Sequence, residues 1–177
     1  MKKIFLVLTI AAFLTACTNE EKKQSTRLPG EFKYTAYNWN ESGDSLGISL
    51  LHYLQIAEDG NYRLIQRNAD GNAVYYYGFI GYDQVAELRK FMADSSLNSN
   101  YIDSTDNGTR YIFDYVNNSG EHRVKFTSAL APESIKNTQV KFDSIINSPG
   151  KKTSSFFNID NYLRQIIAED SATRVKE

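Results

Sequence analysis

Residues 48–80 read ISLLHYLQIAEDGNYRLIQRNADGNAVYYYGFI, and this stretch decides the fold of the chain. Apolar residues alternate with other residues over 48–56, which is the period of a strand with one buried face. Turn signals follow at Asp59-Gly60 and Asp70-Gly71, where glycine can adopt the positive φ that a tight hairpin requires. The stretch therefore predicts three strands of an antiparallel meander, at 48–57, 62–67 and 73–80.

The remaining elements alternate between strand and helix periods. An aromatic-rich segment at 32–39 predicts a further strand before the meander, and 109–117 pairs with 121–128 as a second hairpin. Helical spacing of apolar residues begins near Asp83, whose carboxylate can cap a first turn, again after Pro132, and finally over 159–167. We therefore expect an α+β fold: an antiparallel sheet of about six strands with two or three helices packed on one face.

The chain of 177 residues is long enough for one domain with a sizeable core. We expect a single domain over 32–168, preceded by a polar segment at 17–31 that ends near Pro29-Gly30 and acts as a flexible tether. The charged segment 169–177 is expected to be a frayed tail. Lys and Arg number 20 against 21 Asp and Glu, without a basic stripe, so nucleic-acid binding is not expected.

The N-terminus has the pattern of an export signal. Lys2 and Lys3 precede an apolar stretch at 4–14 that is too short to span a bilayer, and Leu14-Thr15-Ala16-Cys17 follows. This pattern resembles bacterial lipoproteins, in which the signal is removed before the cysteine, the thiol receives a diacylglycerol and the new amino group is acylated, with palmitate as the expected chain. The resemblance implies a signal peptide at 1–16 and lipidation of Cys17, the single cysteine of the chain. The alternative is an ordinary secretory signal followed by a chance cysteine.

Attachment to a membrane is expected to come from the lipid alone, since no later apolar run is long enough to cross a bilayer. We expect a lipid anchor in the outer membrane of a Gram-negative bacterium, on the periplasmic face or at the cell surface. Glu20-Glu21 loosely resembles the acidic export signal of surface lipoproteins in some Gram-negative lineages, although acidic pairs are also common in solvated linkers.

A possible catalytic motif lies at Gly43-Asp44-Ser45-Leu46, which resembles the nucleophile motif of a family of serine esterases and lipases. In that family a late Asp-x-x-His completes the triad, whereas serines stand three residues before both His52 and His122 here. The chain also lacks the alternating parallel α/β pattern of that family. We therefore expect a turn at this motif, no catalytic residue and no enzyme activity, with a small envelope serine hydrolase using Ser45 as the alternative.

A loop at 103–108 partly resembles a calcium-binding loop, with Asp103, Asn107 and Asp114 as possible oxygen ligands. Thr105 replaces an acidic ligand and Asp114 falls in a predicted strand, so we expect no metal site and no cofactor. The two histidines sit among apolar residues of separate hairpins, which favours half-buried structural roles for both.

The chain is rich in aromatic residues, with 12 Tyr, 10 Phe and one Trp. Exposed tyrosines on a sheet could meet a protein partner or stack on sugar rings, but tyrosine is also a common structural residue of strands. We therefore expect a non-enzymatic domain with a binding or structural role, whose partner is an unknown protein or glycan. The possible binding residues are Trp39, Tyr75, Tyr77, Tyr111 and Tyr115.

Alternation along 73–80 divides the aromatic residues of this strand between its two faces. Tyr75, Tyr77 and Phe79 share one face, and Tyr76 lies on the other. We expect the first set to pack under the helix that carries Val85, so that Tyr77→Ala loses about 3 kcal/mol or more of stability.

Overall fold

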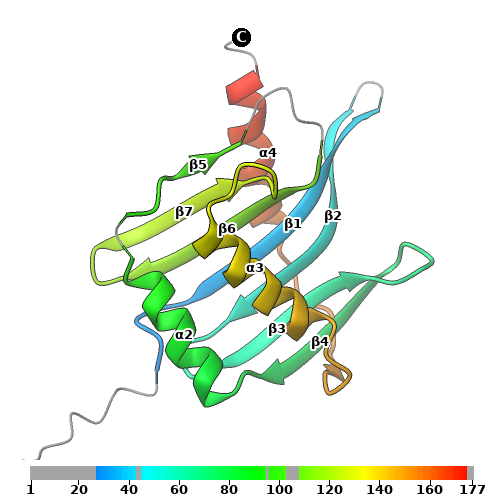
Figure 1. Ribbon diagram of the computed structural model, residues 1–177. Coiled ribbons are helices and arrows are strands. Elements are labelled where there is room, and N and C mark those ends of the chain that lie inside the picture. The colour runs from blue at the N-terminus through cyan, green and yellow to red at the C-terminus, as the bar shows by residue number, and fades with distance from the viewer. Residues whose placement is uncertain (1–26, 43–44, 95, 103–107, 175–177) are drawn as a thin grey trace, which may run out of the picture.

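The computed structural model describes residues 27–42, 45–94, 96–102 and 108–174. Within them the chain forms one sheet of eight strands, in the order β5-β7-β6-β1-β2-β3-β4-β8, and three helices (Figure 1). Neighbouring strands are antiparallel except β5 and β7, which are parallel. The expected α+β class is confirmed, and the sheet exceeds the expected six strands by the two-residue strands β5 and β8 at its edges. The strands are β1 (Phe32–Ser42), β2 (Ser45–Ile56), β3 (Asn61–Arg67), β4 (Ala73–Phe79), β5 (Asn100–Tyr101), β6 (Arg110–Asn117), β7 (Gly120–Phe126) and β8 (Lys152–Thr153).

Hairpin turns at the expected glycines connect β2 to β3 and β3 to β4. Gly60 has a φ of 86° and Gly71 a φ of 79°, in the region that residues with a side chain rarely adopt. These turns fix which residues of neighbouring strands stand opposite each other, so Leu64 of β3 pairs with Leu54 of β2 and with Tyr76 of β4.

Helices cover both faces of the sheet. α2 (Tyr82–Met92) and α3 (Glu133–Ile146) lie side by side on one face, the α2–α3 face, while α4 (Asp160–Arg174) crosses the other, the α4 face (Figure 1). The expectation that the helices share one face is therefore wrong for α4. The reason lies in β1 and β6, which carry apolar residues on both faces: Tyr37 and Ile112 are fully buried and pack with Ile166 of α4.

A β-bulge between β1 and β2 also distributes apolar residues to both faces. The pairing of the two strands shifts between Ala36 and Tyr37, which inserts one unpaired residue into β2. Ile48 consequently packs in the cluster under α4, whereas Leu54 and Ile56 belong to the core under α2 and α3. The apolar residues of 48–56 therefore do not share one face, because the bulge reverses the alternation.

The main core lies between the sheet and the α2–α3 pair and is largely aromatic. Phe113 of β6 is fully buried at its centre, with its ring centroid 5.4 Å from those of Phe32 and Phe91 and 4.8 Å from that of Phe126. Tilted and edge-to-face pairs of this kind stabilise a core beyond the burial of their surface area. Most of the folding free energy is therefore expected to come from this face.

Both ends of the domain extend beyond the limits expected from the sequence. Leu28 is buried in the main core, and its backbone N–H donates to the Glu58 carbonyl oxygen at 2.9 Å. The segment expected to be a flexible tether therefore joins the fold by Leu28. At the other end α4 continues to Arg174, and Asp170, expected to lie in a frayed tail, is 2% exposed.

The tyrosines of β4 face the opposite way from the expectation. Tyr77 is 47% exposed and Phe79 is 60% exposed, whereas Tyr76 packs against the main core. Tyr76 stands opposite Leu64, which is fully buried under the helices, and residues paired across neighbouring strands share a face. The burial of β3 therefore decides the orientation of β4, and the predicted burial of Tyr77 is wrong.

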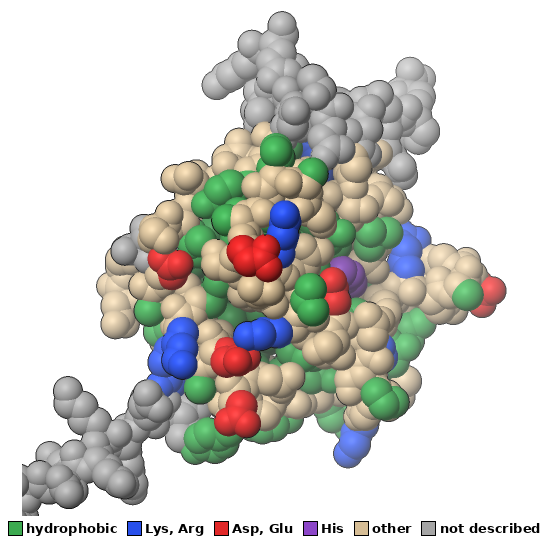
Figure 2. Space-filling view, in the orientation of Figure 1, with side chains coloured by type: hydrophobic (Ala, Val, Ile, Leu, Met, Phe, Trp, Pro, Cys, Tyr) green, Lys and Arg blue, Asp and Glu red, His purple; other side chains and the backbone are tan. Residues whose placement is uncertain are grey.

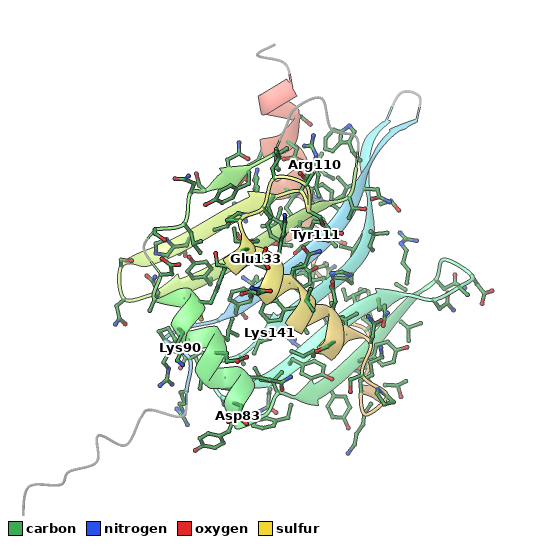
Figure 3. The ribbon with its side chains drawn as sticks, viewed as in Figure 1. Asp83, Lys90, Arg110, Tyr111, Glu133 and Lys141 are labelled. Carbon is green, nitrogen blue, oxygen red and sulfur yellow. The ribbon has the colours of Figure 1, made fainter. Side chains whose placement is uncertain are left out.

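The outer surface of α2 and α3 is polar and mixed in charge. α2 is capped through Gln84, whose side-chain oxygen accepts from the Gly81 backbone N–H at 2.8 Å, rather than through Asp83. Asp83 in the first turn and Lys90 in the last still suit the helix dipole (Figure 3). Figure 2 shows acidic and basic side chains interspersed over both helices, so this surface carries no strong field of one sign.

Candidate functional site

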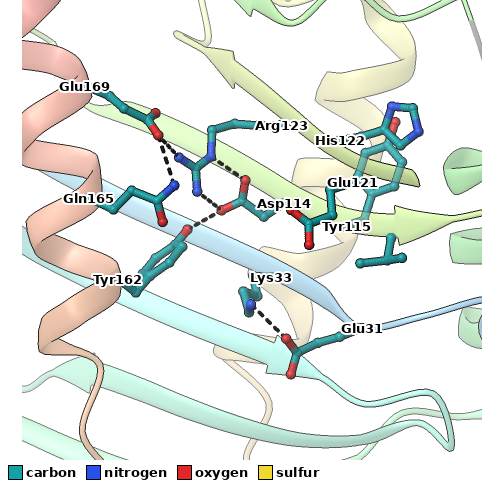
Figure 4. A pocket seen from close by; sticks show the side chains of 11 residues that line it. Glu31, Lys33, Asp114, Tyr115, Glu121, His122, Arg123, Tyr162, Gln165 and Glu169 are labelled. Atoms are coloured by element: carbon teal, nitrogen blue, oxygen red, sulfur yellow. Dashed lines mark hydrogen bonds and ion pairs between the residues drawn. The ribbon is translucent and has the colours of Figure 1, made fainter. Parts of the chain in front are cut away.

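The part of the α4 face that α4 leaves open forms a groove. We call it the α4-side groove, and it consists of two adjoining pockets that share Glu31. The larger pocket, of about 510 Å³, lies beside α4 over β1, β6 and β7 (Figure 4). The smaller, of about 330 Å³, lies over β2, β3 and β4. The residues that line the groove include Glu31, Lys33, Gln55, Arg63, Tyr77, Asp114, Arg123, Tyr162 and Glu169.

Arg123 of β7 organises the larger pocket. Its Nε and Nη2 atoms donate to the two carboxylate oxygens of Asp114 at 2.5 and 3.0 Å, and its Nη1 donates to Glu169 at 2.5 Å. Burial by itself would lower the pKa of Arg123, but hydrogen bonds and charge attraction from Asp114 and Glu169 outweigh it and raise the pKa. Tyr162 adds a hydroxyl that donates to Asp114 at 2.8 Å. This paired network holds the pocket wall in one geometry (Figure 4).

A second ionic cluster fixes α4 to the sheet directly behind this pocket. Asp170 accepts from the Tyr37 hydroxyl at 2.5 Å and from Arg110 Nη1 at 3.0 Å, and Lys125 Nζ lies 3.4 Å from its other oxygen. Lys125 also pairs with Glu169 at 2.9 Å. Arg110 and Asp170 are both almost completely buried, so Arg110 depends on Asp170 for neutralisation, and Asp170 is neutralised by Arg110 and Lys125 together. The position of α4, and with it one wall of the groove, therefore depends on this cluster.

The smaller pocket is connected to the larger one by a row of polar side chains across the strands. Arg63 Nη2 donates to Gln55 Oε1 at 3.0 Å, Gln55 donates to Glu31, and Glu31 pairs with Lys33 at 2.8 Å. The Arg63 guanidinium also lies over the Phe157 ring, 5.1 Å from its centroid. Beside this row, the exposed Tyr77 lines the smaller pocket. The smaller pocket is thus lined by the aromatic ring of Tyr77 together with the amide of Gln55, the guanidinium of Arg63 and the carboxylate of Glu31.

The five aromatic residues proposed from the sequence do not form one patch. Tyr111 and Tyr115 pack in the main core, and Tyr115 is 4% exposed. Trp39 packs against the smaller cluster under α4, and Tyr75 contacts the rings of two neighbouring phenylalanines. Of the five, only Tyr77 is more than a third exposed. Of the five predicted binding residues, Tyr77 is therefore the one that remains a candidate. Phe79, two residues further along β4, is also exposed.

The charged residues of the groove were not predicted, because the sequence-based hairpin was one residue out of register. A loop at 118–120 places Asp114 opposite Val124, whereas in the structure Asn117 pairs with Gly120 and Asp114 stands directly opposite Arg123. That pairing across an exposed face favours an ion pair. The partners from α4, Glu169 and Asp170, carried no comparable signal because they lay in a segment that looked like a tail.

The two histidines lie in separate structural contacts. His52 packs against the Tyr34 ring with centroids 4.7 Å apart, and burial lowers the pKa of His52 to about 4. His122 stacks on Tyr115 at 5.0 Å, and its Nε2 lies 2.8 Å from the side-chain oxygen of Asn117. The two histidines therefore lie apart, each packed on the ring of a tyrosine.

Two motifs from the sequence lie partly outside the described residues. Gly43 and Asp44 are not described, and Ser45 opens β2 without a described side chain. Asp103 and Asn107 of the calcium-like loop are likewise outside.

Within the described ranges no three His, Cys, Asp or Glu side chains are grouped to hold a metal ion. Among these same residues no helix is long and apolar enough to cross a membrane.

Comparison with known proteins supports the N-terminal assignment. Residues 1–18 match the prokaryotic membrane lipoprotein lipid attachment site. The chain is therefore a bacterial lipoprotein that is anchored to a membrane through lipid, as its first residues predict. No curated protein matches the chain.

Proposed function

We propose that the folded domain is a non-enzymatic binding module of the cell envelope and that the α4-side groove is its binding surface. The observation that carries the proposal is the exposure of Tyr77 on a regular strand beside a polar pocket. Tyr77 and Phe79 are both exposed on the same face of β4 while Tyr76 packs in the core, and two neighbouring exposed aromatic rings support a contact surface for a partner.

The rigidity of the groove supports a binding role. Its floor is made of strands, and ion pairs fix the long side chains of Lys33 and Arg123 in the free protein. Binding then costs little additional side-chain entropy, which is the advantage of a preorganised site.

The proposal is tested with the mature chain, residues 18–177, prepared without lipid so that only the folded domain can bind. Envelope material from the producing bacterium is mixed with this protein and pelleted. We expect Tyr77→Ala to reduce the bound fraction several-fold. The control is Tyr82→Ala, which removes a tyrosine that is 68% exposed on α2, outside the groove. Equal binding of both variants and the unmodified chain would contradict a binding role for the groove.

We further propose that the lipid anchor holds the domain in the outer membrane of a Gram-negative bacterium. Cys17→Ser removes the thiol that receives the lipid, so this variant is expected in the soluble fraction. The unmodified protein should sediment with outer-membrane markers in a density gradient. Sedimentation with inner-membrane markers would contradict the outer-membrane location.

A further inference from the structure

We infer that the α4-side groove binds an uncharged oligosaccharide that extends across both of its pockets. This inference rests on the proposed binding function and names the chemical class of the ligand. It depends on three properties of the groove: its charge balance, the chemistry of its lining and its length.

The charge balance of the groove favours an uncharged ligand. Its Asp, Glu, Lys and Arg side chains comprise four carboxylates and three cations, which gives a formal charge of −1. The two cations of the larger pocket are already engaged, since Lys33 pairs with Glu31 and Arg123 pairs with Asp114 and Glu169. A polyanion would have to displace these carboxylates and would face the remaining negative charge.

The chemistry of the lining matches hydroxyl groups. Gln55 and Arg63 are planar groups with several hydrogen-bonding positions, and the carboxylate oxygens of Glu31 and Asp114 accept from O–H donors. A sugar hydroxyl both donates and accepts, so it can bond to either kind of group without a change of ionisation. Tyr77 supplies an apolar ring against which the C–H face of a sugar can pack.

The shape of the groove favours an extended glycan over a protein partner. The two pockets adjoin at Glu31, and each lies within the range of small-ligand sites, about 300–1,000 Å³. The centre of a protein interface is usually depleted of charged residues, whereas ion pairs line the larger pocket along its floor. A chain of sugar rings can instead lie across the strands, with one ring against Tyr77 and others beside Tyr162.

The experiment titrates the lipid-free mature chain, residues 18–177, with defined probes by calorimetry. The probes are neutral hexasaccharides of glucose, mannose, galactose and N-acetylglucosamine, with polygalacturonate and heparin as acidic comparisons. We expect at least one neutral hexasaccharide to bind with an affinity that is unchanged between 50 and 500 mM NaCl, because no ionic contact is formed with an uncharged ligand.

Three variants locate the binding. Tyr77→Ala should weaken binding about tenfold or more, since it removes the aromatic contact of the site. Gln55→Leu keeps a similar volume and should also weaken binding, whereas Tyr82→Ala should bind as the unmodified chain does. Thermal unfolding of each variant confirms that the fold is retained, as expected for the exposed Tyr77.

The outcomes separate the ligand class from the proposed function. Tighter binding of either acidic polymer than of every neutral probe would overturn the inference, as would neutral binding that Tyr77→Ala leaves unchanged. If no neutral probe binds while envelope material is still retained through Tyr77, the glycan assignment fails and the binding function stands. If Tyr77→Ala changes neither readout, both fail.

Discussion

The two faces of the sheet are built from alternate residues of the same strands, yet they differ in chemistry. Under α2 and α3 the side chains form a continuous aromatic core centred on Phe113. Under α4 a smaller apolar cluster forms around Tyr37, Ile112 and Ile166, and ion pairs continue from it into the open groove. We expect the first face to supply most of the folding free energy, which leaves the second free to carry a rigid polar surface.

The largest effect is expected from Phe113→Ala on the α2–α3 face. Phe113 is fully buried and contacts four other phenylalanine rings, so the truncation should leave a cavity and cost about 3–5 kcal/mol in the free energy of unfolding. Urea denaturation measures this loss. Phe156→Ala is the matched control, because Phe156 is 68% exposed, and it should change stability by less than about 1 kcal/mol. Similar losses for the two variants would show that the core is not centred on Phe113.

The next effect concerns the ionic cluster on the α4 face. Asp170→Ala leaves Arg110 buried without its carboxylate partner and should cost about 3 kcal/mol. The double variant Arg110→Met with Asp170→Leu should lose clearly less, since replacing both charges avoids an unpaired buried ion. Glu87→Gln, which breaks the exposed pair with Lys141, is the control and should change stability by under about 0.5 kcal/mol. A loss in the double variant as large as that of Asp170→Ala would contradict the coupling between Arg110 and Asp170.

A smaller, pH-dependent effect is expected from His52 on the α2–α3 face. Burial lowers the pKa of His52 from 6.5 to about 4, so the folded protein keeps this side chain neutral at pH values where the unfolded chain is protonated. Since the unfolded state binds more protons between pH 6.5 and 4, stability falls as the pH drops through this window, by about 2 kcal/mol from pH 7.5 to 5.

His52→Leu removes this contribution while keeping the position apolar. Urea unfolding at pH 7.5 and 5 should therefore show a smaller pH dependence for the variant than for the unmodified chain. Equal pH dependence in both proteins would mean that His52 is not held neutral in the fold.

The features that could be predicted from the sequence are those set by local chemistry. The glycine turns at 60 and 71, the hairpin of β6 with β7 and the helix near Val85 all follow from residues close together in the chain, although the register of that hairpin differs by one residue from the prediction. The groove could not be predicted in the same way, because its walls join distant segments: Tyr37 and Asp170 are separated by 133 positions in the chain. The orientation of Tyr77 depended on which face of β3 is buried, and alternation alone does not give that information.

The division of the sheet into a core face and a binding face is tested most directly by comparing Tyr76→Ala with Tyr77→Ala in urea unfolding. The two residues are adjacent on β4, but Tyr76 packs against the main core and Tyr77 is 47% exposed. We expect Tyr76→Ala to lose about 2 kcal/mol or more and Tyr77→Ala less than about 1 kcal/mol. A larger loss for Tyr77→Ala than for Tyr76→Ala would contradict the account, because Tyr77 would then belong to the core rather than to the groove.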